Sequence, residues 1–418
     1  MVEHRRIDRP MRIALVTEVF LPAVDGVVTR LRHTLEQLQE AGDEILVVAP
    51  AGGPPEYAGA VIVGMPGLRM PLYPDGVGYP EKRVSLPGAG LGDALRQFRP
   101  ELVHAVNPVL LGAGAVYQAR RLRVPLVASF HAHLPTYAHY YGLGLLEPLG
   151  WRYIRALHNQ ANLNLCTSDA TLRALSNKGV ERLELWPYGV ELERFAPRPT
   201  SDPWRERLSG GHPDRVILLY VGRLAREKDL GRLLPAVRDV SGVALSIVGD
   251  GPLRPELERR FAGTATTFPG LLTGEELSSA YAAADVFVFP SHTETLGIAM
   301  LEARAASLPV IAADSPTARE LIRDGFDGLR FDPLATESLV TAVTRLVEDP
   351  SARAFMGQEA RKAVEHATWA GATETLRRHY ERANEMSICR RRRWRRPAPA
   401  TRLRGTGQPH QEHIEEAA

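Results

Sequence analysis

The chain has 418 residues, of which 44% are hydrophobic and 24% charged, and its formal net charge is +2 at pH 7. This composition is typical of a soluble globular protein, and the length predicts two domains of about 200 residues each. The near-neutral charge argues against a general nucleic-acid binder, so no nucleic-acid partner is expected. The N-terminal residues 1–10 contain no apolar signal core, and no apolar run approaches the length of a membrane-spanning helix.

The two cysteines, Cys166 and Cys389, have no metal-ligand spacing. We therefore expect no metal site, and a reduced, cytoplasmic compartment rather than a disulfide framework. The stretch 1–10 is expected to be a disordered N-terminus.

The apolar pattern of residues 11–17 predicts a first buried strand, followed by a loop and by a helix over 27–41. The loop carries no G-x-G-x-x-G, which disfavours a dinucleotide site. Gly26 stands where the helix begins, and it can present amides to a phosphate or leave room for an acceptor. Further strands are expected at 44–49, 60–65, 102–106, 125–129, 162–166 and 184–186. Helices such as 91–98 and 113–122 alternate with them, which predicts a parallel sheet covered on both faces over 11–188.

Two segments of this first domain are expected to lie near a ligand. The Gly- and Pro-rich span 64–92 predicts an extended surface excursion. His131 directly follows a predicted strand, at the end where open α/β sheets place their ligand sites, so we expect it to be functional. His133 and His139 are interpreted as surface residues, because no carboxylate stands at metal-ligand spacing.

Regular periodicity is lost over 189–213, which we interpret as an interdomain linker. A second α/β series then covers 214–365, with strands at 216–221, 243–248 and 286–289. Each strand ends in a distinctive turn. Because parallel strands bring their carboxyl ends to one edge, the polar residues of these turns are expected to share a crevice. They are Arg223, Lys228, Gly249, Asp250, Glu294 and Glu302.

The last of these turns predicts a phosphate site. A helix is expected from Gly297, which puts the amides of Leu296, Gly297 and Ile298 at its positive end. Glu294 and Glu302 could accept hydroxyl groups on either side of a phosphate. The alternative is that both glutamates are solvated residues flanking an ordinary helix.

Arg223 and Lys228 are the cations expected to match a diphosphate, the guanidinium fixing geometry and the ammonium supplying charge. The alternative is a solvated ion cluster with Glu227. The turn at Gly249 lacks a third glycine in register, since Arg254 stands there, so a pyrophosphate turn for NAD is disfavoured.

Helices at 334–346 and 351–365 are expected to close the second domain, and another follows at 369–386. Residues 387–418 hold eight Arg against three Glu and are expected to be a disordered basic tail. The tail is either a solvated extension or a contact with anionic lipid headgroups, anchored by Trp394.

Together these motifs resemble the retaining GT-B glycosyltransferases of family 4, over about residues 11–385. The shared residues are Gly222-Arg-Leu with Glu227-Lys228, Gly249-Asp-Gly-Pro, Ser291-x-x-Glu-Thr-Leu-Gly with Glu302-Ala, Pro309-Val-Ile-Ala, and Tyr188-Gly-Val-Glu-Leu-Glu-Arg-Phe-Ala-Pro. The resemblance implies two Rossmann-like, doubly wound parallel-sheet domains that face each other across a cleft. Met70-Pro-Leu-Tyr and the segment 129–141 look like GDP-mannose-dependent α-mannosyltransferases and sulfoquinovosyl-diacylglycerol synthases.

The resemblance also implies roles on the donor side. Arg223 and Lys228 would neutralise the leaving diphosphate, and Glu294 would hold hydroxyls of the donor sugar. Glu302 would hold the ribose. The amides of Gly297 and Ile298 would face the β-phosphate.

Other implied roles lie farther from the phosphates. Gly26 would lie at the donor–acceptor junction, and His131 beside the anomeric centre. Gly249 and Asp250 would be close to the base. The helix over 366–386 would cross back to the first domain. Ser307 departs from the glycine that such proteins usually carry, which increases the conformational demand on that turn.

The expected activity is transfer of a hexose from GDP-mannose or a UDP-hexose to an acceptor hydroxyl of a lipid or glycolipid, with retention. No metal cofactor is expected, because the cations come from the protein. The location is cytoplasmic, with peripheral binding at the inner face of the cell membrane as a further expectation. The alternatives are a GT-B-like nucleotide-sugar epimerase, an NAD-dependent oxidoreductase and a non-catalytic carbohydrate-binding protein.

Overall fold

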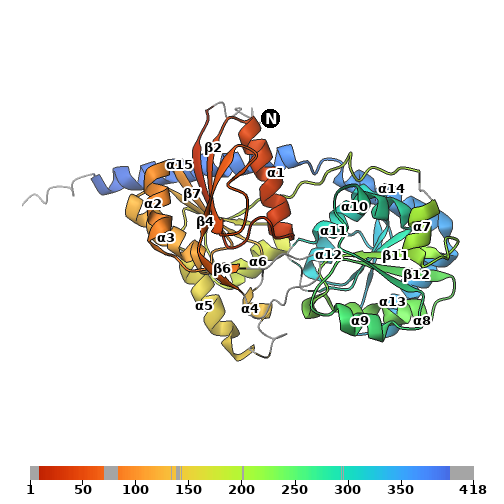
Figure 1. Cartoon of the computed structure of the whole chain (residues 1–418). Helices are drawn as coiled ribbons and strands as arrows, with labels where there is room; N and C mark the ends of the chain where they lie inside the picture. The colour runs from red at the N-terminus through yellow and green to blue at the C-terminus, as the bar shows by residue number, and fades with distance from the viewer. Residues whose placement is uncertain are drawn as a thin grey trace, which may run out of the picture.

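Two parallel sheets, one in each half of the chain, organise the computed structural model (Figure 1). The structure describes residues 9–69, 83–132, 134–137, 142, 144–199, 202–292, 294 and 296–395. Met70-Pro-Leu-Tyr, His133 and His139 lie outside these residues. In the described part of the chain, no helix is both long enough and apolar enough to cross a membrane.

The first sheet has eight strands in the order β10-β9-β8-β7-β1-β2-β4-β3, and every pairing except β3 with β4 is parallel. The strands are β1 Arg12–Thr17, β2 Glu44–Pro50, β3 Glu56–Tyr57, β4 Ala60–Met65, β7 Leu102–Val106, β8 Leu126–Phe130, β9 Leu163–Cys166 and β10 Leu183–Leu185. The helices are α1 Gly26–Glu40, α2 Ala89–Phe98, α3 Leu111–Leu122, α4 Leu134–Tyr137, α5 Glu147–His158 and α6 Asp169–Asn177. The predicted excursion over 64–92 includes an antiparallel pair, β5 Gly67–Arg69 with β6 Arg83–Ser85.

Alternation along β1 explains why helices cover both faces of this sheet. Ile13 and Leu15 pack on the face covered by α1, whereas Ala14 and Val16 pack on the face covered by α2 and α3. Successive side chains of a strand point to opposite faces, so a continuous apolar run such as β1 needs cover on both.

The second sheet has six strands, all parallel, in the order β13-β12-β11-β14-β15-β16. They are β11 Val216–Val221, β12 Val243–Val248, β13 Thr266–Gly270, β14 Val286–Phe289, β15 Val310–Ala313 and β16 Gly328–Phe331. The helices are α7 Asp202–Ser209, α8 Leu234–Arg238, α9 Arg254–Arg260, α10 Gly274–Ala283, α11 Ile298–Ala305, α12 Pro316–Leu321, α13 Thr336–Glu348 and α14 Pro350–Val364. The chain therefore has the predicted α/β class, with two doubly wound parallel-sheet domains.

Two predicted boundaries need correction. The linker assigned to 189–213 contains α7, whose Leu208 is fully buried in the core of the second domain, so this domain begins before residue 214. The last helix, α15, runs over Trp369–Arg395 rather than ending at 386. The arginine run offers no apolar face for packing, but arginine has a high intrinsic helix propensity, which allows the helix to continue.

Helix α15 crosses back to the first domain, as Figure 1 shows in blue. Its Leu376 and Ala383 are fully buried in that domain's core. The guanidinium of Arg377 donates to both carboxylate oxygens of Asp43, at 2.9 and 3.1 Å, and both side chains are largely buried. Because a buried pair of this kind is bidentate and desolvated, it fixes the helix on the first domain.

A second contact joins the two domains. The Glu320 carboxylate of α12 accepts the backbone N–H groups of Asp169 and Ala170, both at 3.0 Å. These amides belong to the first turn of α6, where unpaired N–H groups and the helix dipole favour a negative charge.

Candidate active site

The turns after β11 and β12 are packed directly against each other. The backbone N–H of Leu224 donates to Asp250 O at 2.8 Å, and the N–H of Leu253 donates to Leu224 O at 3.0 Å. A Cβ on Gly249 would lie 1.9 Å from Gly222 O. Only glycine permits this approach, so the two predicted turns form one rigid unit at the carboxyl edge of the sheet.

Two cation–carboxylate pairs stand on this edge. Arg223 pairs with Glu227, and Lys228 pairs with Glu294 from the turn after β14. Ser291 Oγ donates to Glu227 O at 3.2 Å, which fastens the two turns together. Glu227 is 2% exposed, so the cluster is not the solvated group that the alternative interpretation required.

The cations are held in a partly desolvated setting. Burial lowers the pKa of Lys228 to about 8, opposed by the negative charge of Glu227 and assisted by the positive charge of Arg223. An ammonium group surrounded by protein interacts with a further anion more strongly than one in water. The arrangement can therefore stabilise a concentrated negative charge, such as a diphosphate.

The predicted helix terminus lies beside these cations. Gly297 has φ +72°, and the first helical hydrogen bond runs from Met300 N to Gly297 O at 2.9 Å. The amides of Leu296, Gly297 and Ile298 precede that bond, at the positive end of α11. The backbone of Gly297 is left-handed, and an added Cβ would lie 2.2 Å from Met300 Cε. Glycine is therefore the residue that fits at this position.

The ends of α11 are otherwise held by neighbouring residues. Thr317 Oγ1 donates to Glu294 O at 2.6 Å, which fixes the backbone that carries the Glu294 carboxylate. Ser307, after the helix, has φ +58°. The expected conformational demand is therefore present, because a residue with a Cβ occupies a left-handed position there.

Glu302 lies one turn into α11 and contacts a different group. Its Oε2 accepts a hydrogen bond from Tyr281 OH at 2.9 Å. Burial raises the pKa of Glu302 to about 7, whereas the Tyr281 hydrogen bond and the charge of Arg194 oppose the rise. A carboxylate held this way can accept a hydroxyl group, and it becomes a poorer acceptor when protonated.

The first domain meets this site at Gly26. A Cβ on Gly26 would lie 2.6 Å from Ile298 Cδ1, so the start of α1 touches the start of α11. Tyr188 lies between the domains, because charges that act on its pKa come from Glu302 on one side and from Arg30 and Asp25 on the other. The predicted junction residue therefore does adjoin the predicted donor residues.

Asp250 has a role within its own turn. Its Oδ1 accepts the N–H of Gly251 at 2.6 Å, and its Oδ2 accepts Arg254 Nη1 at 3.3 Å. The side chain is 4% exposed. The carboxylate therefore stabilises the turn, and a contact with a base remains a prediction.

His131 belongs to a buried network of the first domain. Its backbone N–H donates to Asn107 Oδ1 at 3.1 Å, and its ring lies edge-on to Trp186 with centroids 5.7 Å apart. It directly follows β8 at the carboxyl edge, as predicted.

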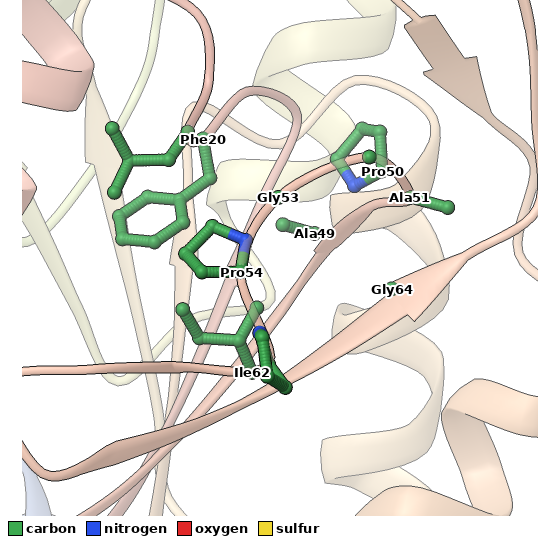
Figure 2. Close-up of a pocket in the computed structure, with 11 residues that line it drawn as sticks. Phe20, Ala49, Pro50, Ala51, Gly53, Pro54, Ile62 and Gly64 are labelled. Atoms are coloured by element: carbon green, nitrogen blue, oxygen red, sulfur yellow. The ribbon is translucent and has the colours of Figure 1, made fainter.

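An apolar pocket lies at the same edge of the first sheet, away from the charged residues. Figure 2 shows Phe20, Pro54 and Ile62 lining it, together with the backbone of the loop after β2. None of the residues that line it is titratable, so the pocket does not suit a diphosphate. Among the described residues, no group of three or more His, Cys, Asp or Glu is arranged to hold a metal ion.

The sequence interpretation missed several roles that hold the site together. Glu227 was given a role only in a solvated ion cluster, and Arg254 was noted only as a departure from a glycine pattern. Each nevertheless stands four positions from its partner, Arg223 or Asp250, a spacing that brings side chains together on a helical turn. Tyr281, Thr317 and Glu320 gave no local signal, because each acts on a residue that only the tertiary fold brings near.

Comparison with known proteins identifies the same two halves. Residues 24–194 match the model of Glycosyltransferase Family 4, and residues 204–363 match that of Glycosyl transferases group 1. A sulfoquinovosyl transferase of Arabidopsis thaliana is 35% identical over 90% of this chain and 74% of its own. A GDP-mannose-dependent α-mannosyltransferase of Mycobacterium tuberculosis is 37% identical over 89% of this chain and 96% of its own.

A more distant relative and one solved structure extend the comparison. An α-monoglucosyldiacylglycerol synthase of Streptococcus pneumoniae is 27% identical over 76% of this chain and 74% of its own. The crystal structure of Anabaena HepE in complex with UDP and glucose superposes with a TM-score of 0.72 at 18% identity, over 89% of this chain and 99% of that one. At this identity the superposition shows the fold, GT-B, and nothing further.

Proposed function

The chain belongs to glycosyltransferase family 4, and on this premise we propose that it moves a hexose from GDP-mannose or a UDP-hexose to a hydroxyl group of a lipid or glycolipid. The observation that carries the proposal is the Lys228–Glu294 pair, set beside Arg223 and the start of α11. A diphosphate there would meet two cations and the positive end of a helix, and the sugar would meet a carboxylate.

The paired side chains suggest how the donor enters. Lys228 and Glu294 neutralise each other, so neither charge is left uncompensated in a partly buried site. An incoming diphosphate would replace Glu294 as the ion-pair partner of the Lys228 ammonium. Glu294 would then accept hydrogen bonds from hydroxyl groups of the sugar. Glu302 would accept the ribose hydroxyls, as its position one turn farther along α11 allows.

The chemical step is proposed to proceed with retention and without a metal ion. As the bond between the anomeric carbon and the phosphate oxygen breaks, Arg223, Lys228 and the α11 amides would stabilise the charge that develops on the leaving diphosphate. We assign no protein nucleophile. The departing phosphate oxygen would accept the proton of the acceptor hydroxyl on the same face, while the closed domains exclude water.

The lipid acceptor is supported by the relatives, of which one is named a synthase of monoglucosyldiacylglycerol and two others carry sulfoquinovosyl and mannosyl transfer in their names. None of the three is named an epimerase or an oxidoreductase. The epimerase and NAD alternatives therefore have no support from family membership.

A donor and acceptor screen tests the proposal. We expect GDP or UDP and the matching sugar conjugate to raise Tm, because a ligand that binds only the folded state stabilises it. NAD serves as the control and should give no shift. Mass spectrometry with a lipid extract should then reveal a hexosylated lipid, at a rate that EDTA does not change. Interconversion of sugar nucleotides without acceptor would instead indicate an epimerase.

We further propose that the first domain binds an anionic membrane through the start of α5. Leu145, in the short 3-10 turn Gly144–Leu146 just before α5, is 97% exposed, and Leu149 and Tyr153 of α5 are also exposed. Arg152 is exposed among them. Apolar side chains interleaved with arginine are typical of a helix that lies in a lipid interface. The helix is at the lower edge of the first domain in Figure 1 (yellow).

Flotation with vesicles containing anionic phospholipid tests this surface. Replacing Leu145 and Leu149 by serine should abolish most of the bound fraction, because the helix loses the apolar area that enters the interface. Leu334→Ser is the matched control, since Leu334 is 92% exposed on the second domain. Equal flotation of the double variant and the wild type would refute the proposal. Changing the arginines at 390–393 to glutamine tests the predicted tail contact separately.

A further inference from the structure

A chain of buried hydrogen bonds leads from α15 to His131. Tyr380 OH lies 2.8 Å from His104 Nδ1, and His104 Nε2 lies 2.8 Å from Ser129 Oγ. The same Ser129 Oγ lies 2.8 Å from His131 Nε2. Tyr380, His104 and Ser129 are at most 1% exposed. The last helix of the chain is thus connected, through β7 and β8, to the candidate catalytic histidine.

Which atom donates in each of these hydrogen bonds follows from where the hydroxyl protons of Tyr380 and Ser129 can go. Among the described residues, the only hydrogen-bond partner of Tyr380 OH is His104 Nδ1. If His104 Nδ1 carried a proton, the buried phenol would have no acceptor for its own, which is costly. The phenol therefore donates to Nδ1, and the proton of a neutral His104 lies on Nε2.

The same reasoning gives the direction of the hydrogen bonds of Ser129. His104 Nε2 donates to Ser129 Oγ, so the serine hydroxyl must place its own proton elsewhere. The acceptor at 2.8 Å is His131 Nε2. A neutral His131 then carries its proton on Nδ1.

Both imidazoles are neutral at physiological pH. Burial and the charge of Arg30 lower the pKa of His104 to about 3, and the same two causes, with the neighbouring histidines, hold the pKa of His131 well below its usual value. Burial also holds the pKa of Tyr380 well above its usual value, so the phenol keeps its proton.

We propose that Tyr380 is a positioning residue that, through His104 and Ser129, fixes His131 in the tautomer protonated on Nδ1. Insofar as it concerns catalysis, this inference rests on the proposed function. Held this way, His131 offers an N–H donor at Nδ1 and cannot act there as a base. It would donate a hydrogen bond to an oxygen of the donor sugar rather than remove a proton from the acceptor.

Nitrogen NMR of the full-length protein labelled with ¹⁵N-histidine tests the tautomer directly. The His131 signals are identified by their loss in His131→Gln. The wild type should show His131 protonated on Nδ1 and unprotonated on Nε2. In Tyr380→Phe, His104 Nδ1 loses its hydrogen-bond partner whether or not it carries a proton. Neither direction of the hydrogen-bond chain is then favoured, so both tautomers of His131 should be populated. Ser129→Ala, which breaks the chain next to His131, should give the same result.

Kinetics supply the second readout. Tyr380→Phe should lower kcat about tenfold, the effect of one lost hydrogen bond in such a chain, while KM for the donor stays within about twofold. The control is His379→Leu, because His379 Nε2 contacts Leu185 O and docks the same helix without touching His104. That variant should lose stability but keep kcat and the tautomer.

The outcomes separate this inference from the proposed function. His131 protonated on Nε2 in the wild type, or an unchanged tautomer and kcat in Tyr380→Phe, would overturn the role of Tyr380 even if sugar transfer is confirmed. A wild type that transfers no sugar would overturn the proposed function, whereas the NMR result would still decide the tautomer.

Discussion

Lys228→Ala is expected to lower kcat by about two to three orders of magnitude, the usual effect of losing a group that stabilises transition-state charge. The variant removes the cation nearest to Glu294 and leaves that carboxylate without its partner in a partly buried site. Initial rates with a saturating donor and acceptor measure the loss. Lys362→Ala is the matched control, because Lys362 is 63% exposed and pairs with Glu359 on the surface. Activity of Lys228→Ala near that of the wild type would contradict the diphosphate assignment.

The pH profile offers an independent check on the same residue. The pKa of Lys228 is about 8, so the ammonium is present below that pH and is lost above it. kcat/KM, which reports the free enzyme, should therefore fall as pH rises through about 8. A bound diphosphate favours the cation, so the basic limb of kcat should lie at higher pH. Lys228→Arg should remove the basic limb from both the kcat/KM and the kcat profile, since arginine stays charged. A basic limb that persists in this variant would belong to another group.

Gly249→Ala is expected to lower kcat/KM for the donor about a hundredfold, the effect typical of a misplacement of about 1 Å in a catalytic group. The added Cβ would lie 1.9 Å from Gly222 O, which is backbone and cannot rotate away. The turn that carries Arg223 would have to shift. Steady-state kinetics measure the effect, and a thermal melt records the accompanying loss of stability.

Gly242→Ala provides the control for this substitution. Gly242 directly precedes β12, has φ +73° and would place its Cβ in open space, whereas Gly249 directly follows the same strand with φ +128°. Both substitutions introduce backbone strain, but only one separates the two turns. Gly242→Ala should lower Tm modestly and leave kcat/KM unchanged. Equal kinetics for the two variants would show that contact between the turns does not position Arg223.

The sequence predicted the parts of the fold that depend on local pattern. The buried strands β1, β11, β12 and β14 are predominantly apolar segments bounded by turn residues, and all four lie where predicted. Strand β13, with the sequence TTFPG, carries no such run and was not predicted. It is a strand because β12 pairs with it, a tertiary effect that overrides weak propensity.

The boundaries depended on packing and were predicted less well. The proline-rich start of the second domain was interpreted as linker, yet Leu208 of α7 is fully buried in that domain's core. The end of α15 was placed where apolar periodicity stops, although a helix needs only its backbone hydrogen bonds to continue. The burial of Leu208 depends on neighbours distant in sequence, whereas the continuation of α15 depends on local backbone hydrogen bonds that apolar periodicity does not report.

By itself, the sequence determined that Arg223, Lys228, Glu294 and Gly297 stand at strand ends, and parallel topology then required those ends to share an edge. Only the tertiary structure decided that Lys228 pairs with Glu294, that Glu302 is held by Tyr281, and that Tyr380 is connected to His131. The physical reason is that strand position follows from local periodicity. Hydrogen-bond partners and desolvation, in contrast, depend on side chains that only the fold brings together, such as His104 and Tyr380, which are 276 positions apart in the sequence.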